Sequence, residues 1–131
     1  MLPIDHIGIA VPELANAVAD YQTNFGAVLE YRERLPEQGV EVAFLKTGAS
    51  RIELLAAIDK SSPFARSVAS RGYGLHHICF LVKDIEKELA RLMALGLRLV
   101  DAAPRLGAKG KRIAFIHPQS VGGVLTELCE R

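Results

Sequence analysis

The sequence predicts a single α+β domain made of two tandem βαβββ modules. Three observations predict it: a strand motif that occurs twice, a helical pattern of apolar residues after each copy, and later strands separated by turn residues. The two motifs are Ile4–Val11 (IDHIGIAV) and Leu75–Val82 (LHHICFLV). We expect module one at 1–58, a connector at 59–74 and module two at 75–131. Together they should form a half-open mixed β-barrel with the helices on the outside.

The spacing of residues supports the duplication. The two strand motifs are 71 positions apart, and segment 113–116 (IAFI) follows segment 42–45 (VAFL) by the same 71. Glu127 follows Glu53 by 74 positions, so the turn before the last strand is three residues longer in the second module. That turn is rich in glycine and proline, where an insertion costs little.

Each module is expected to contain a strand, a helix and three further strands. Apolar residues recur at helical spacing from Leu14 to Phe25, and Gly26 suits the end of that helix. Asp84 suits the N-cap of the second helix, and Ser62 that of a short helix in the connector. The elements expected in module one are 3–11, 12–25, 27–34, 39–47 and 50–58. Those expected in module two are 75–82, 84–95, 97–102, 111–117 and 122–130.

Composition excludes several classes of protein. The 131 residues include 16 basic and 15 acidic side chains, a net charge of +1, which predicts neither a nucleic-acid nor a membrane partner. No apolar run reaches the ~18 residues that span a bilayer. The first strand begins by Pro3 or Ile4, so we expect no signal peptide. Two cysteines, Cys79 and Cys129, are too few for a disulfide framework, and we expect a reduced, cytoplasmic compartment.

Four polar side chains occupy repeat-related strand positions. His6 and His77 lie in the two motifs, and Glu53 and Glu127 lie in the later strands RIELL and LTELC. Side chains alternate along a strand, so all four should project from the sheet face opposite the helices. A lone strand histidine is usually structural, but an inward glutamate needs a partner or a metal. Two imidazoles and two carboxylates suit a divalent ion, and the nearby cysteines are expected to line the same concavity.

With these residues in hand, the chain resembles the vicinal oxygen chelate (glyoxalase/bleomycin resistance/dioxygenase) superfamily. Within it, the chain is most similar to the methylmalonyl-CoA epimerase family, over almost its whole length. The segments that carry the resemblance are DHIGIAV (5–11), PEQGV (36–40), IELL (52–55), GLHHI (74–78), GAKGK (107–111), HP (117–118) and GVLTE (123–127).

The resemblance implies that His6, His77 and Glu127 hold a divalent metal, with Glu53 completing the set. Cobalt is expected first, with manganese, nickel or zinc as alternatives. It also implies interconversion of (R)- and (S)-methylmalonyl-CoA by proton abstraction and return through a metal-chelated enolate. Some family members carry glutamine in place of Glu53, and some bacterial ones carry a catalytic glutamate in place of Val42. The departure at Val42 leaves the second catalytic base open.

Our hypothesis is that Glu53 and Glu127 flank the enolate and act as the two bases. The alternative, that Glu53 is only a ligand, stays open. Lys109, Lys111 and Arg112 form a basic run that would contact coenzyme A phosphates, although a solvated surface loop is the default interpretation of such a run.

Two other functions use the same fold. One is a glyoxalase I-type isomerase acting on a glutathione hemithioacetal, and the other is a non-catalytic member that binds a small molecule. In each case the partner is a small molecule. A homodimer is also expected, because open β-rich folds have edges to cover.

Overall fold

The computed structural model describes residues 2–131. The chain divides into two compact units. The first unit is Ile7–His76, and the second combines the residues up to His6 with His77–Arg131. The first strand, β1 (Ile4–Ala10), therefore contributes to both units. These units differ from the sequence modules in assigning the start of β1 to the second unit and residues 75 and 76 to the first.

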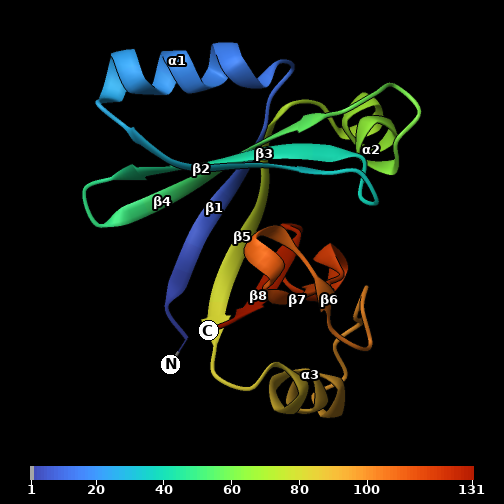
Figure 1. Cartoon of the computed structure of the whole chain (residues 1–131). Helices are drawn as coiled ribbons and strands as arrows, with labels where there is room; N and C mark the ends of the chain where they lie inside the picture. The colour runs from blue at the N-terminus through green and yellow to red at the C-terminus, as the bar shows by residue number, and fades with distance from the viewer. Residues whose placement is uncertain (1) are drawn as a thin grey trace. The chain divides into compact units, whose positions relative to one another are not determined.

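The first unit is a four-stranded sheet with two helices. Besides β1, its elements are α1 (Leu14–Phe25), β2 (Val28–Leu35), β3 (Val40–Thr47), β4 (Ser50–Ala57) and α2 (Pro63–Arg71). The strand order is β2-β3-β4-β1, with β4 parallel to β1 and antiparallel to β3. Helix α1 lies against β3 and β4 (Figure 1). Leu14, Leu45 and Leu54 form the centre of the core between them.

The second unit repeats this arrangement. Its elements are β5 (Gly74–Val82), α3 (Ile85–Ala94), β6 (Arg105–Leu106), β7 (Arg112–Ile116) and β8 (Thr126–Glu130), with short 3-10 turns η1 (Ala108–Gly110) and η2 (Pro118–Ser120). The order is β5-β8-β7-β6, with β5 parallel to β8. Helix α3 packs on β7 and β8 (Figure 1). The start of the chain joins this sheet, because the Leu81 N–H donates to the Pro3 carbonyl at 2.9 Å.

The predicted helix ends are largely confirmed. The Asp84 carboxylate accepts from the Lys87 N–H at 3.0 Å, and Ser62 caps α2 in the same way. Gly26 ends α1 in the left-handed conformation, at φ 66°. The start of α1 is the exception: the helix begins at Leu14, because the Glu13 side chain caps it.

Two predicted strands of module two are wrong in extent. Segment 97–102 is not a strand: Leu99 makes a single bridge to Ile116, and the edge strand is β6 instead. The segment still bonds to β7 at a few points, such as the Val100 N–H to the Phe115 carbonyl at 2.9 Å. The Phe115 N–H, however, donates to the Asp101 carboxylate at 2.8 Å rather than to a backbone carbonyl, so the pairing is irregular. The last strand begins at Thr126 rather than near 122, because η2 and the following turn occupy the inserted residues.

The helices cover only the later half of each motif strand. Ile9 in β1 and Val11 just after it pack in the α1 core, whereas Ile7 is 38% exposed. In β5, Phe80 and Val82 pack in the α3 core. Ile7 is therefore not part of the buried core under α1.

The strand register of the two units repeats along with the sequence. Glu53 and Glu127 each have a phenylalanine beside them on one neighbouring strand and a small residue beside them on the other. The two sets are Phe44, Glu53 and Gly8, and Phe115, Glu127 and Cys79. The duplication read from the sequence is thus present in the hydrogen-bonded pairing of both sheets.

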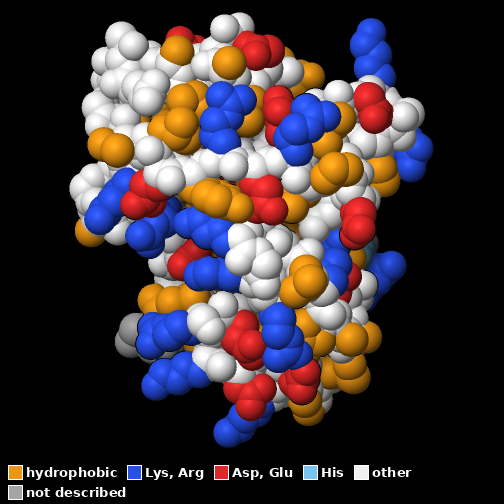
Figure 2. All heavy atoms as spheres, viewed as in Figure 1, with side chains coloured by type: hydrophobic (Ala, Val, Ile, Leu, Met, Phe, Trp, Pro, Cys, Tyr) orange, Lys and Arg blue, Asp and Glu red, His pale blue; other side chains and the backbone are white. Residues whose placement is uncertain are grey.

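Basic side chains are interspersed with acidic ones on the face drawn in Figure 2. This mixing fits the formal net charge of +1. Among residues 2–131, no helix is long and apolar enough to span a membrane.

Candidate metal-binding site

The second unit brings two histidines into direct contact. His6 Nε2 lies 3.2 Å from His77 Nε2, and the rings meet edge to face at 86°. The two residues are 4% and 1% exposed. Two neutral imidazoles at this distance either share one proton or turn both lone pairs toward a cation.

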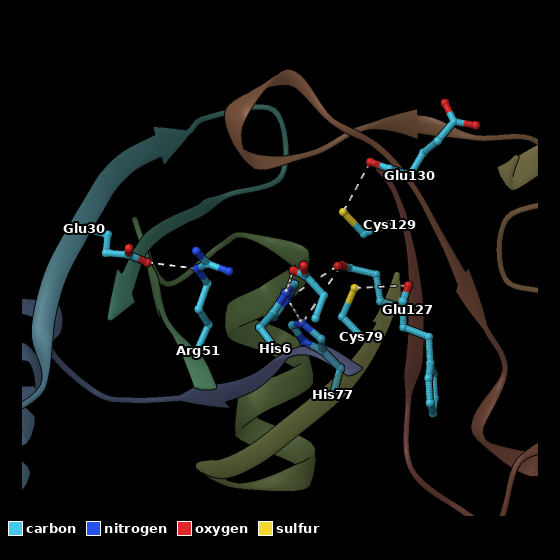
Figure 3. A network of polar contacts seen from close by, with 10 residues as sticks. His6, Glu30, Arg51, His77, Cys79, Glu127, Cys129 and Glu130 are labelled. Atoms are coloured by element: carbon cyan, nitrogen blue, oxygen red, sulfur yellow. Dashed lines mark hydrogen bonds and ion pairs between the residues drawn. The ribbon is translucent and has the colours of Figure 1, made fainter. Parts of the chain in front are cut away.

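Glu127 joins the two histidines from β8, the strand next to β5. Its Oε1 lies 3.6 Å from His6 Nε2, and its Oε2 lies 4.0 Å from His77 Nε2. Figure 3 shows the three side chains pointing toward one another. The sequence-based expectation that these residues meet on one face of the sheet agrees with this geometry.

These residues fit a divalent ion by the chemistry of their donors. A buried carboxylate costs several kcal/mol unless a cation or good hydrogen bonds compensate it. Glu127 is buried, and two imidazole nitrogens that can carry lone pairs lie 3.6 and 4.0 Å from its carboxylate oxygens. Imidazole and carboxylate together are ligands that transition metals accept.

Asp5 is a site residue that the sequence reasoning did not identify. Its Oδ2 lies 2.8 Å from His6 Nδ1, the ring nitrogen on the far side from His77. Asp5 could have been considered because it directly precedes His6 in the sequence. Strand alternation, however, places neighbouring side chains on opposite faces of the sheet.

Phe115 was also missed. Its ring meets the His77 ring edge to face at 5.8 Å between centroids, and the Arg105 guanidinium carbon lies over the Phe115 ring, 5.3 Å from its centroid. The apolar ring fixes the plane of His77, and its equivalence to Phe44 in the repeat could have identified it.

Cys79 and Cys129 lie beside Glu127, as expected, and both are buried free thiols. The hydrogen bond to Cys129, burial and the Glu127 charge together raise the pKa of Cys79. A thiol that stays protonated is a poor metal ligand and a poor nucleophile. The burial of both side chains agrees with the interpretation of the cysteines as lining.

Glu53 occupies the equivalent position on β4 of the first unit. It is 6% exposed and lies between Phe44 and Gly8 in the strand register. Its environment within that sheet therefore matches that of Glu127.

The basic run lies around η1. Lys109 adopts the left-handed conformation, at φ 61°, and Lys111 is exposed. Arg112 is engaged by two carboxylates, with Glu130 at 3.1 Å and Glu86 in close contact. Arg112 would have to leave these partners to bind a phosphate.

Residues 5–115 match the model of the Glyoxalase/Bleomycin resistance protein/Dioxygenase superfamily. The chain belongs to this superfamily. Members of the superfamily bind divalent metals, which agrees with the donor set of the second unit.

Within this superfamily, the similar proteins include epimerases. The chain is 41% identical over 127 residues to the uncharacterized protein YqjC of Bacillus subtilis, covering 97% of this chain and 91% of that protein. It is 37% identical to the ethylmalonyl-CoA/methylmalonyl-CoA epimerase of Cereibacter sphaeroides, covering 95% of both chains. A solved methylmalonyl-CoA epimerase in complex with methylmalonyl-CoA and NH4+ has a TM-score of 0.92 at 38% identity, covering 99% of this chain and 94% of that one.

The likeness to that solved structure over nearly the whole chain confirms the predicted fold class. The relatives also identify the chain as an enzyme of the epimerase class.

Proposed function

We propose that the protein is a metal-dependent epimerase that interconverts (R)- and (S)-methylmalonyl-CoA. The observation that carries this proposal is the convergence of His6, His77 and Glu127 in the second unit, with ligand atoms 3.2 to 4.0 Å apart. The substrate is proposed from relatives that are named methylmalonyl-CoA epimerases at 36–38% identity.

The proposed ligands are His6, His77, Glu127 and Glu53. The first three are supported by their mutual distances, and Glu53 by its burial and by its repeat equivalence to Glu127. Co²⁺ is the first choice of ion, and Mn²⁺, Ni²⁺ or Zn²⁺ also suit imidazole and carboxylate donors. Such an ion would neutralise the negative charge that develops on the thioester oxygen, which is worth several kcal/mol.

Proton transfer is assigned to Glu127 and Glu53. Epimerisation removes the proton between a thioester and a carboxylate and returns it to the opposite face. Inversion at a planar enolate is simplest with one base on each side. The related strand environments of the two glutamates support a paired role.

The alternative for Glu53 is a ligand role without proton transfer. Glu53→Gln separates the two, because glutamine can still coordinate through its carbonyl oxygen but cannot accept the proton. A variant that keeps both the ion and the full epimerisation rate would limit Glu53 to a ligand role.

We also propose that Lys109, Lys111 and Arg112 contact the coenzyme A phosphates. Lys111→Glu is then expected to raise KM far more for the CoA ester than for a truncated pantetheine ester, because only the former carries these phosphates. An equal rise in KM for both esters would indicate that the basic run is a solvated surface loop that does not contact the phosphates.

The decisive experiment for the reaction is hydrogen exchange. The protein is incubated with methylmalonyl-CoA in deuterium oxide, with and without a chelator, and label at the acidic carbon is scored by mass spectrometry. We expect chelator-sensitive label entry. Exchange only with the glutathione–methylglyoxal adduct would favour the glyoxalase alternative, and no exchange with either substrate would favour a binding protein. Ethylmalonyl-CoA belongs in the same assay, because one relative is named for both esters.

A homodimer and a cytoplasmic location complete the proposal. β2 ends the sheet order of the first unit and leaves an edge that a second copy could cover. Light scattering should give a mass near twice the 14.2 kDa of one chain.

The free thiols of Cys79 and Cys129 suit a reducing compartment.

A further inference from the structure

We propose that Asp5 is a positioning residue that fixes the tautomer of His6, so that Nε2 is the nitrogen presented to the metal. This inference rests on the proposed metal site. It concerns a residue one position before the ligand, and its role differs from those of the four proposed ligands.

The two nitrogens of the His6 ring have different partners. Nδ1 lies 2.8 Å from Asp5 Oδ2, and Nε2 lies 3.2 Å from His77 Nε2 and 3.6 Å from Glu127 Oε1. An ionised carboxylate can only accept a hydrogen bond, so Nδ1 must carry the proton and donate it. In a neutral ring, Nε2 then carries the lone pair, on the side where His77 and Glu127 lie.

The setting makes this hydrogen bond effective. The His6 side chain is 4% exposed and that of Asp5 is 18% exposed, so water competes little for the contact. A charge-assisted hydrogen bond in such a setting is roughly twice as strong as a neutral one. A carboxylate on the far nitrogen also raises the basicity of the coordinating nitrogen and holds the ring plane.

The repeat does not place a carboxylate directly before the second histidine. The position equivalent to Asp5 is His76, whose ring lies 5.3 Å from that of Phe64. The His77 ring has the edge-to-face contact with Phe115 described above. The residues that directly precede the two ligand histidines therefore make different contacts.

The first test is the affinity of the metal-free protein for Co²⁺, titrated against a competing chromophoric chelator. We expect Asp5→Ala to bind roughly 10- to 100-fold more weakly, as losses of outer-shell partners typically do. Asp5→Asn should fall between Asp5→Ala and wild type, because its carbonyl oxygen can still accept from Nδ1–H but carries no charge. Asp20→Asn on the exposed side of α1 removes the same charge elsewhere and should bind like wild type. Thermal melts of each metal-free variant establish that it folds.

The second test reads the tautomer without any metal. Nitrogen-15 NMR of the imidazoles in the metal-free protein should show His6 protonated at Nδ1 in wild type and in Asp5→Asn. In Asp5→Ala the population should move toward Nε2–H. A purely structural role for Asp5 would not move this signal.

Distinct outcomes overturn the two proposals. Asp5→Ala with wild-type affinity within twofold and an unchanged tautomer would remove Asp5 from the site. Cys79→Ala losing as much affinity as Asp5→Ala would indicate instead an ion held by Asp5, His6 and Cys79, whose ligand atoms lie within 4.8 Å of one another. If wild type takes up no ion, the proposed function fails, and the NMR measurement still decides the role of Asp5.

Discussion

At the scale of single residues, the site depends on polar groups held where water cannot reach them. His77 and Glu127 lie on the adjacent strands β5 and β8, so their main chains fix how far apart the side chains can be. The Phe115 ring packs against His77, and Phe115 and Cys79 lie beside Glu127 on the two neighbouring strands. Preorganisation of this kind lowers the ordering cost of binding an ion.

His77→Ala should therefore abolish most metal binding. We expect an affinity loss of at least about 100-fold, larger than the 10- to 100-fold typical of outer-shell changes, because a ligand itself is removed. Titration of the metal-free protein with Co²⁺ measures it. The control is His117→Ala, which removes the Nδ1 that accepts from the Gln119 N–H at 3.1 Å and leaves the proposed ligands intact. Equal affinities for the two variants would exclude His77 as a ligand.

Cys79 should resist modification in the native state. Cys79 is fully buried and its pKa is raised by the contact with Cys129, by burial and by Glu127, so little thiolate forms even at mildly alkaline pH. A chromogenic disulfide reagent at pH 8.5 is expected to react with Cys79 only after denaturation. Its immediate reaction in the folded protein would contradict both the burial and the direction of the pKa shift.

The sequence predicted the proposed ligands because the repeat placed a histidine and a glutamate at matching strand positions in each module. It could not predict Asp5, since alternation alone places adjacent strand residues on opposite faces. The carboxylate reaches His6 Nδ1 by a side-chain rotation that no periodic pattern records. Whether Glu53 serves as ligand, base or both stays a prediction.

At the scale of elements, the helices are held by one apolar face each and by a polar cap at the first turn. In α3, Ile85, Leu89 and Leu92 bury against β7 and β8, and Asp84 caps the helix. The same two strands, β7 and β8, contain the site residues Phe115 and Glu127. The stability of α3 therefore supports the position of the site.

Leu89→Ala should destabilise the protein by about 2 to 5 kcal/mol, because it leaves a cavity under the helix. Leu89 is 2% exposed, whereas Leu95, just after the helix, is 65% exposed. Leu95→Ala is thus the matched control and should change the free energy of unfolding by roughly 0.5 kcal/mol or less. Urea denaturation measures both, and similar losses for the two variants would be incompatible with this core.

The elements most visible in the sequence were those with strong periodicity or caps, such as α3 with Asp84. The strand predicted at 97–102 failed because its apolar residues look like a strand, while Asp101 turns back to bond the Phe115 N–H. A side-chain-to-backbone bond of this kind competes with the ladder. Only the folded arrangement of β7 reveals it.

At the scale of the whole molecule, duplication does not divide the proposed ligands evenly. The sequence modules contribute two each, but His6, His77 and Glu127 all lie within the second compact unit. The start of β1 belongs with β5 there, as the bond from the Leu81 N–H to the Pro3 carbonyl indicates. That unit supplies three of the four proposed ligands, and only Glu53 comes from the first.

Metal binding should consequently stabilise the folded chain. An ion at 100 times its dissociation constant adds about 2.7 kcal/mol to the free energy of unfolding, provided that the unfolded chain does not bind it. Melting curves with Co²⁺ and after chelation measure the effect. His77→Ala should show almost no such stabilisation, and an equal gain for that variant would place the ion elsewhere.

X-ray absorption spectroscopy of the Co²⁺-loaded protein tests the metal centre most directly. We predict two imidazoles with oxygen ligands around the ion and no sulfur. A sulfur shell at about 2.3 Å, the distance typical of metal thiolates, or the absence of imidazole scattering would contradict this account.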